Sequence, residues 1–169
     1  MLISHFLIGS PSSGKSTLAN QLIKLQSTAK IISTDAIRAL IFGDESIQGD
    51  WSLIEENVLS QMRESFKAGQ PVIYDATNAK REWRKSLLSQ VASDNVQWMA
   101  WHLQTPLELC KAWNKQRLRQ VPDTVIDEYF QSLKDDPPRV EEGFVAINSV
   151  LLTQKEFDWV QVEYMLKQI

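Results

Sequence analysis

A glycine-containing segment near the N-terminus constrains this chain more than any other feature of its sequence. Residues 9–16 read GSPSSGKS, which fits the pattern G-x-x-x-x-G-K-S/T, and they lie between an apolar run at 2–8 and a helical pattern at 17–23. Glycines allow backbone angles at which consecutive N–H groups point at one anion, and a helix N-terminus adds partial positive charge. The segment therefore predicts a phosphate-binding loop, or P-loop, between a strand and a helix.

The residues of this loop divide the expected contacts with a nucleotide. We expect Lys15 to reach the β- and γ-phosphates of ATP and the Ser16 hydroxyl to hold Mg²⁺. The other predicted nucleotide-binding residues of the loop are Gly9, Ser12, Ser13, Gly14 and Thr17. The alternative is a plain strand-to-helix turn with an exposed lysine, which the flanking strand and helix disfavour.

Apolar runs and amphipathic runs alternate along the rest of the chain. Strands are predicted at residues 30–34, 71–75, 96–103 and 144–151, and helices at 35–42, 51–67, 80–91, 106–119, 122–134 and 157–168. This alternation predicts an α/β fold of the P-loop NTPase type, with a five-stranded, mostly parallel sheet and helices on both faces. We expect residues 1–169 to form a single domain with a helical lid at about 106–134.

Composition and charge exclude several classes of protein. The chain has 169 residues and a net charge of −3, which is not typical of a general nucleic-acid binder. Its single cysteine, Cys110, excludes an intrachain disulfide framework and favours a reducing compartment, so we expect a cytoplasmic protein. The N-terminal apolar run is too short and lacks the basic flank of a signal peptide, and no membrane partner is expected.

Two basic runs, at residues 80–85 and 111–119, contrast with this acidic balance. They suggest that basic groups line one face of the molecule, while the acidic C-terminal part keeps the rest soluble. A plain solvated helix face is the alternative for the second run.

The sequence does not fit two other classes of P-loop protein. GTPases read guanine through N-K-x-D, whereas Asn114-Lys115 is followed by Gln116 and Arg117. ATPase motors usually place a glutamate beside the aspartate that ends a strand, whereas Asp75 is followed by Ala76. The remaining class is a kinase that transfers the γ-phosphoryl group to a bound acceptor.

Such a kinase needs an acceptor-side base, an acceptor clamp, a carboxylate near the metal and mobile arginines. Asp35, directly after a predicted strand, is the candidate base, and Arg38, three residues on, is the candidate clamp for an acceptor phosphate. Asp75 is the candidate for orienting Mg²⁺ or holding the acceptor. Arg117 and Arg119 are the candidates for a lid that closes over ATP.

Each of these residues also has a purely structural interpretation that the sequence leaves open. Asp35 fits the N-cap of the helix 35–42, and Arg38 fits a solvated helix position. Asp75 fits a turn at residues 75–78.

Three segments resemble the kinase domain of bacteriophage and bacterial polynucleotide 5′-hydroxyl kinases. They are residues 9–17 (GSPSSGKST), 33–38 (STDAIR) and 72–78 (VIYDATN), with further similarity at 114–122, 136–138 and 142–144. The resemblance covers most of the chain up to about residue 150 and leaves the last twenty residues unplaced.

The resemblance implies a role for each matching residue. Lys15 and Ser16 would bind the ATP phosphates and the metal, and Asp35 would be the general base on the 5′-hydroxyl. Arg38 would contact an acceptor phosphate, and Arg117 would engage the ATP phosphates. Asp75 and Asn78, the first and last residues of the D-x-T-N segment, are predicted to bind the acceptor.

From these residues we expect an ATP- and Mg²⁺-dependent phosphotransferase that acts on a hydroxyl, with the 5′-hydroxyl of DNA or RNA favoured. A kinase of a small metabolite or antibiotic is one alternative. An ATP-binding regulatory module without a physiological acceptor is another. The sequence decides neither the acceptor nor whether the chain forms an oligomer.

Overall fold

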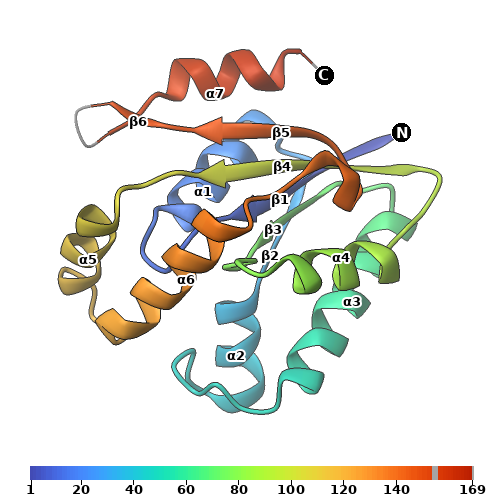
Figure 1. Cartoon of the computed structure of the whole chain (residues 1–169). Helices are drawn as coiled ribbons and strands as arrows, with labels where there is room; N and C mark the ends of the chain where they lie inside the picture. The colour runs from blue at the N-terminus through green and yellow to red at the C-terminus, as the bar shows by residue number, and fades with distance from the viewer. Residues whose placement is uncertain (154–155, 169) are drawn as a thin grey trace.

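Five parallel strands form the central sheet of the computed structural model, which describes residues 1–153 and 156–168. They are β1 (Leu2–Ile8), β2 (Lys30–Ser33), β3 (Val72–Asp75), β4 (Val96–Leu103) and β5 (Phe144–Val150). Their order across the sheet is β2-β3-β1-β4-β5, and every neighbouring pair is parallel (Figure 1). The α/β prediction is therefore confirmed, with a sheet that is entirely parallel rather than mostly so.

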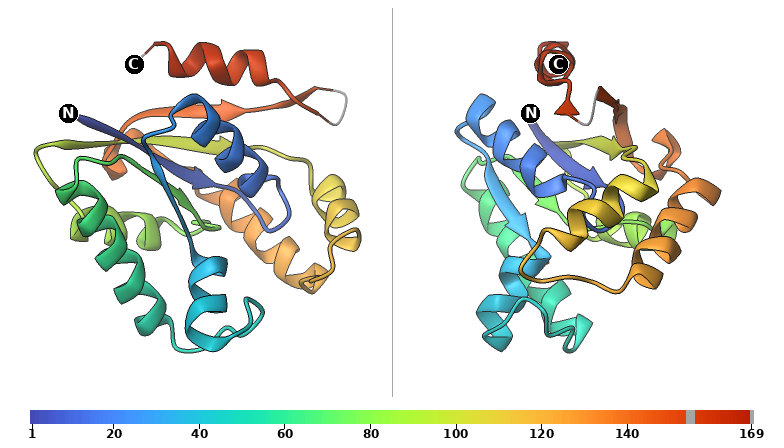
Figure 2. Two further views of the ribbon diagram at one scale, coloured as in Figure 1. Left: turned by 180° about the vertical axis from the view of Figure 1, so that it is seen from behind. Right: turned by 90° about the vertical axis from the view of Figure 1, so that its left-hand side faces the viewer.

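Helices cover both faces of this sheet (Figure 2). They are α1 (Lys15–Leu25), α2 (Thr34–Phe42), α3 (Trp51–Lys67), α4 (Arg81–Gln90), α5 (Leu107–Lys115), α6 (Asp123–Asp135) and α7 (Trp159–Leu166). Alternate residues of β1 join two separate cores: Phe6 and Ile8 pack with residues of α3 and α4, and Leu7 packs with residues of α1 and α7. Burial on both faces explains why the central strands read as continuous apolar runs.

Most predicted boundaries agree with the structure within one or two residues, α1 being two residues longer at each end than the pattern at 17–23, and the largest difference lies in the second half of the chain. Helix α3 and strand β4 have the predicted bounds, whereas α5 ends at Lys115 instead of Arg119. A short antiparallel hairpin, β6 (Leu152–Thr153) and β7 (Glu156–Phe157), precedes α7, which begins at Trp159 rather than at residue 157. A 3₁₀ turn, η1 (Val140–Glu142), leads into β5.

The order of the strands brings three candidate segments to one edge of the sheet. The P-loop follows β1, Asp35 lies in the first turn of α2 directly after β2, and Asp75 ends β3. Because β3 lies between β2 and β1, Asp75 stands between the other two segments. The carboxyl edge of a parallel sheet is where ligands of such folds bind.

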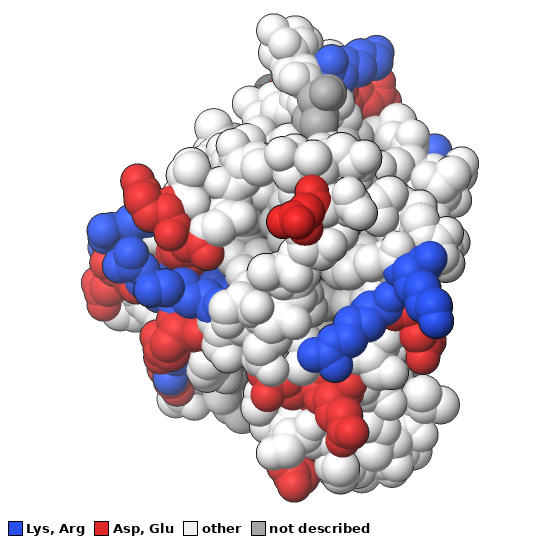
Figure 3. Space-filling model, turned by 90° about the vertical axis from the view of Figure 1, so that its right-hand side faces the viewer, with Lys and Arg blue, Asp and Glu red and all other residues white. Residues whose placement is uncertain are grey.

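The basic runs are largely paired with acids, contrary to the expectation of a basic face. The pairs are Lys80 with Glu128 at 3.7 Å, Arg84 with Glu142 at 2.6 Å and Lys111 with Asp127 at 2.6 Å. On the face drawn in Figure 3, basic and acidic groups adjoin in small clusters. Within the described residues, no helix is long and apolar enough to cross a membrane.

Candidate phosphoryl-transfer site

The P-loop joins β1 to α1 through two residues in the left-handed backbone region. Ser12 has a φ of 58° and Gly14 a φ of 99°. A side chain at Gly14 would also collide with the ring of Phe157 from β7. Only glycine satisfies both the backbone angle and this contact, so the second glycine of the motif is required by the structure.

Lys15 lies folded against the loop that precedes it. Its Nζ donates hydrogen bonds to the carbonyl oxygens of Gly9 at 3.0 Å and Ser10 at 2.8 Å. Burial lowers the pKa of Lys15, while the charges of Asp75 and Asp35 act in the opposite direction. The ends of β2 and β3 therefore lie within electrostatic range of the P-loop lysine.

Ser16 and Asp75 form the oxygen pair that we predict to hold Mg²⁺. The Ser16 hydroxyl donates to Asp75 Oδ2 at 2.7 Å. Burial raises the pKa of Asp75, and both Lys15 and the hydrogen bond from Ser16 oppose that rise. Asp75 thus ends a buried strand and also faces the loop, which a plain turn residue does not require.

These residues fit a magnesium–nucleotide complex. The described residues contain no cluster of three or more His, Cys, Asp or Glu side chains that could hold a metal alone. Mg²⁺ beside a nucleotide typically uses one or two protein oxygens together with phosphate oxygens and water, which Ser16 and Asp75 match. The buried Ser13 Oγ has no hydrogen-bond partner in the described part of the chain, so the loop retains a free hydroxyl.

Asp35 and Arg38 lie one turn apart on α2. The N-cap of this helix is Ser33, whose hydroxyl accepts from the Ala36 N–H at 3.4 Å. Asp35 therefore does not cap the helix, and its carboxylate contacts side chains instead of the backbone. Arg38 Nη1 donates to Asp35 Oδ1 at 2.9 Å.

The segment between α5 and α6 brings two arginines to this site. Arg117 Nη1 donates to Ser12 Oγ of the P-loop at 3.3 Å. Arg119 Nη1 lies 3.5 Å from Asp35 Oδ2 and 3.7 Å from Glu45 Oε1. The two predicted lid arginines thus face different parts of the site.

Asn114 fixes this segment, and the sequence analysis did not select it. Its side-chain amide donates to the Val121 carbonyl at 2.8 Å, and its Oδ1 accepts from the Val121 N–H at 3.0 Å. This reciprocal pair replaces further helical turns and explains why α5 ends at Lys115. The sequence marks Asn114 only as a polar residue within a segment that resembles the polynucleotide kinases. Nothing in the sequence indicates that it pairs with Val121.

Asn78 and Thr17 stand apart from this group. The Asn78 amide donates to the carbonyls of Leu7 at 2.7 Å and Ala76 at 3.3 Å, and the side chain is buried. These contacts hold the loop after β3 against the end of β1. Thr17 lies exposed on the first turn of α1. Direct contacts of either residue with a ligand stay predictions.

A buried ion pair between α4 and η1 stabilises the loop that follows β3. Arg84 on α4 donates to Glu142 Oε2 at 2.6 Å and Oε1 at 2.8 Å, and to the carbonyls of Asn78 and Ala79. Both charged side chains are fully buried. The sequence places Arg84 in a basic run, and its pattern does not distinguish this one buried arginine from its exposed neighbours.

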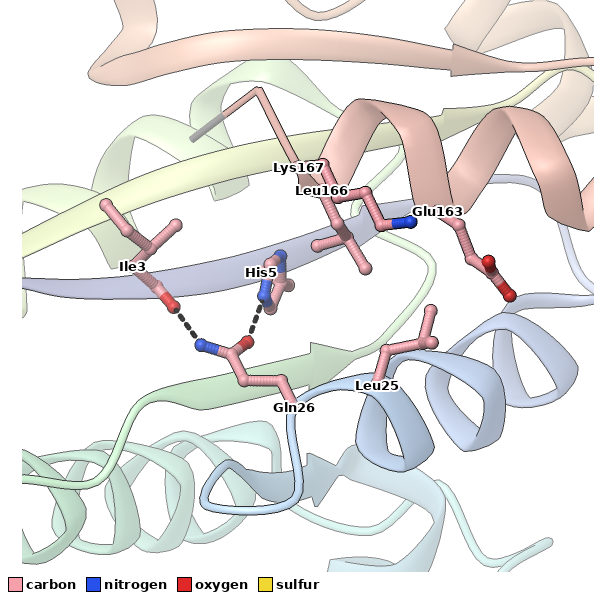
Figure 4. A pocket seen from close by; sticks show the side chains of 7 residues that line it. All are labelled: Ile3, His5, Leu25, Gln26, Glu163, Leu166 and Lys167. Atoms are coloured by element: carbon pink, nitrogen blue, oxygen red, sulfur yellow. Dashed lines mark hydrogen bonds between the residues drawn. The ribbon is translucent and has the colours of Figure 1, made fainter.

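A cavity of about 320 Å³ lies between β1, the end of α1 and α7, and no predicted site residue lines it (Figure 4). His5 faces it with both ring nitrogens engaged. Nδ1 accepts from the Trp101 indole at 2.9 Å, so Nε2 donates to Gln26 Oε1 at 2.5 Å. Burial lowers the pKa of His5, which remains a neutral, satisfied core residue.

A second cavity of about 320 Å³ borders the start of the P-loop at Ser10 and the end of β4 at His102. Burial and the nearby Arg84 charge lower the pKa of His102 to about 4. His102 is therefore neutral near neutral pH.

A family model described as AAA domain matches residues 5–136 of this chain. The match includes the P-loop, the Asp35–Arg38 pair, Asp75 and both arginines between α5 and α6.

Two curated proteins of Schizosaccharomyces pombe (strain 972 / ATCC 24843) are similar to the chain. The bifunctional polynucleotide phosphatase/kinase is 28% identical over 149 residues, which cover 85% of this chain and 32% of that protein. Protein kti12 is 26% identical over 132 residues, which cover 71% of this chain and 47% of that protein. The chain therefore spans less than half the length of either relative.

Solved structures share the fold at low sequence identity. A chain of the Pnkp1/Rnl/Hen1 RNA repair complex matches with a TM-score of 0.72 and 21% identity, over 79% of this chain and 44% of that one. A gluconokinase from Sinorhizobium meliloti 1021 matches with a TM-score of 0.57 and 20% identity, over 89% of this chain and 83% of that one.

Proposed function

We propose that this chain, which belongs to the family described as AAA domain, is an ATP- and Mg²⁺-dependent kinase that phosphorylates a hydroxyl. Its recognition as a P-loop kinase of the polynucleotide 5′-hydroxyl kinase-like type is confirmed by the family match and the similar proteins. The acceptor that we propose is the 5′-hydroxyl of DNA or RNA.

One observation carries this proposal: a carboxylate, Asp35, is paired with Arg38 and acts electrostatically on the P-loop lysine. A binding module that only holds a nucleotide does not need an acid–arginine pair at this edge. A kinase needs both, because one group accepts the proton and the other holds the acceptor.

The residues divide the reaction as follows. Asp35 accepts the proton of the acceptor hydroxyl. The hydroxyl oxygen forms a bond to the γ-phosphorus of ATP, the bond from that phosphorus to the β–γ bridging oxygen breaks, and ADP leaves. Lys15 and Arg117 stabilise the negative charge on the transferred group. Ser16 and Asp75 would hold Mg²⁺, which neutralises phosphate charge when bound.

The similar proteins bear on the choice of acceptor. A relative named as a polynucleotide phosphatase/kinase supports a 5′-hydroxyl. The gluconokinase fold match keeps a small-metabolite acceptor as the second candidate. The relative named Protein kti12 carries no acceptor in its name, so an ATP-binding regulatory module without an acceptor stays the third candidate. The cytoplasmic location and the single-domain organisation of residues 1–169 stay predictions.

The test is transfer of labelled γ-phosphate from ATP to 5′-hydroxyl DNA and RNA oligonucleotides and to D-gluconate. We expect Asp35→Asn to lower turnover by about 10²–10⁴-fold, the typical contribution of a general base, with the Kd for ATP unchanged. Lys15→Ala should weaken ATP binding as well.

Glu56→Gln, which removes an exposed acid of α3, is the matched control and should retain full activity. Normal turnover in Asp35→Asn would refute the assigned base. Transfer to D-gluconate alone would replace the polynucleotide acceptor with a small metabolite.

A further inference from the structure

We propose that Arg119 serves the acceptor rather than ATP, and that it forms with Arg38 a clamp for an anionic group beside the acceptor hydroxyl. Glu45 holds Arg119 in position while no acceptor is bound. This inference rests on the proposed function, since it assigns the acceptor class of the same site.

The first support is the direction of the two arginines between α5 and α6. Arg117 contacts Ser12 of the P-loop, whereas Arg119 lies between Asp35 and Glu45. The Asn114–Val121 pair fixes the ends of this short segment, so its two arginines are held in different directions. One faces the nucleotide loop and the other faces the proposed base.

The second support is an unused donor on Arg38. Its side chain is 13% exposed, and Nη1 is bonded to Asp35. Its Nε is buried and has no hydrogen-bond partner among the described residues. A buried guanidinium N–H without an acceptor is costly, and a phosphate or carboxylate oxygen on an incoming ligand would satisfy it.

The third support is the length of the Arg119 contacts. At 3.5 and 3.7 Å they exceed the 2.7–2.9 Å that is typical of a charge-assisted hydrogen bond. Both carboxylates are also substantially exposed, at 42% for Asp35 and 45% for Glu45. An ion pair of this kind contributes little to stability, so a ligand anion can replace it at low cost.

Together these contacts make the ability of Asp35 to accept a proton dependent on the acceptor anion. While Arg119 faces Asp35, both carboxylate oxygens of Asp35 have an arginine beside them, at 2.9 and 3.5 Å. An acceptor anion that draws Arg119 away frees Oδ2 to take the hydroxyl proton. A neutral alcohol leaves Arg119 in place, so the site should discriminate against acceptors that lack a phosphate or carboxylate near the hydroxyl.

The experiment measures equilibrium binding of three acceptors by calorimetry, independently of transfer. The probes are thymidine 3′-monophosphate, D-gluconate and thymidine, which carry a phosphate, a carboxylate and no anion. The variants are Arg119→Ala, Arg117→Ala and Glu45→Gln. The matched control is Arg63→Ala, an exposed arginine of α3.

We expect Arg119→Ala to weaken binding of the preferred anionic acceptor by about tenfold or more, with the Kd values for thymidine and ATP unchanged. Arg117→Ala should weaken ATP instead, and Glu45→Gln should tighten the anionic acceptor. Whichever of the phosphate and carboxylate probes depends on Arg119 identifies the anion.

Three results would overturn the inference: a loss in Arg119→Ala that is equal for thymidine and its 3′-phosphate, an effect on ATP alone, or no binding of either anionic probe to the wild type. A failure of the proposed function would be distinguishable from a failure of this inference. If Arg119 governs acceptor binding but no phosphate is transferred, the clamp stands and the kinase activity does not.

Discussion

The charge state of Asp75 depends on two immediate neighbours. Burial raises the pKa of this carboxyl, and the Lys15 charge and the Ser16 hydroxyl both oppose the rise. The side chain therefore links the P-loop lysine and the predicted metal-binding hydroxyl, and its negative charge is what a bound cation would use.

We expect Asp75→Asn to remove the gain in ATP affinity that Mg²⁺ provides. Asparagine keeps the shape and can still accept from Ser16, but it lacks the charge. The loss should be about tenfold, as is typical when a residue supporting a metal site is changed. The measurement compares the Kd for ATP in Mg²⁺ and in EDTA.

Asp35→Asn is the control, because it also removes a negative charge near Lys15 but does not contact Ser16. It should retain the full effect of Mg²⁺. If Asp75→Asn retained it too, Asp75 would belong to the acceptor side.

For single residues, the sequence predicts contacts that are local in the chain, and it predicts a distant contact only where a motif and a strand end assign both residues to one ligand, as for Ser16 and Asp75. The P-loop motif and the i,i+3 spacing of Asp35 and Arg38 are enough to place those side chains together. The contact of Arg119 with Asp35 joins residues 84 positions apart and depends on how the α5–α6 segment turns. No spacing rule contains that information.

Helix α4 is tied to the turn η1 by the buried Arg84–Glu142 pair. Arg84 also donates to carbonyls at 78, 79 and 136, so one side chain connects α4, the loop after β3 and the end of α6. The site loop therefore depends on a residue outside the site.

We expect Arg84→Met to lower the free energy of unfolding by about 3–5 kcal/mol, because it leaves the buried Glu142 carboxylate with only the more distant, partly exposed Arg81 at 4.0 Å as a cationic partner. The double variant Arg84→Met/Glu142→Leu should recover most of that loss, since it buries no charge. Urea unfolding at constant pH measures both. A double variant as unstable as the single one would assign the loss to the carbonyl contacts of Arg84 instead.

The boundaries of helices and strands are predictable where their cause is local in the sequence and unpredictable where it is a distant contact. The period of apolar residues predicts α3 at 51–67, and the structure has that helix. The end of α5 and the β6–β7 hairpin escape prediction, because one depends on the Asn114–Val121 pair and the other on pairing of two-residue strands. Such short strands carry almost no pattern of their own.

For the molecule as a whole, strand order is what turns separate motifs into a site. The alternation of strands and helices predicts a parallel sheet, but it does not by itself specify that β3 lies between β2 and β1. That arrangement puts Asp75 between the P-loop and Asp35. His102, near the end of β4, lies on the face of the sheet covered by α4 and α6.

His102 should make the stability of the whole fold dependent on pH. Its pKa is about 4 in the folded state, against 6.5 as the ordinary value. Between these two pH values the unfolded chain binds more protons than the folded one. The contribution of His102 to the free energy of unfolding is therefore fully present above about pH 6.5 and is lost as the pH falls toward 4. Between pH 7 and pH 5 this one residue should account for about 2 kcal/mol.

The measurement is urea unfolding from pH 5 to 7.5 at constant ionic strength, for the wild type and for His102→Gln. Other groups of the chain also change protonation with pH, among them His5, whose pKa burial lowers. Those groups are the same in both proteins, so the difference between the two curves isolates His102. Parallel curves would mean that His102 accepts a proton in the folded state as readily as in the unfolded chain, which its burial beside Arg84 argues against.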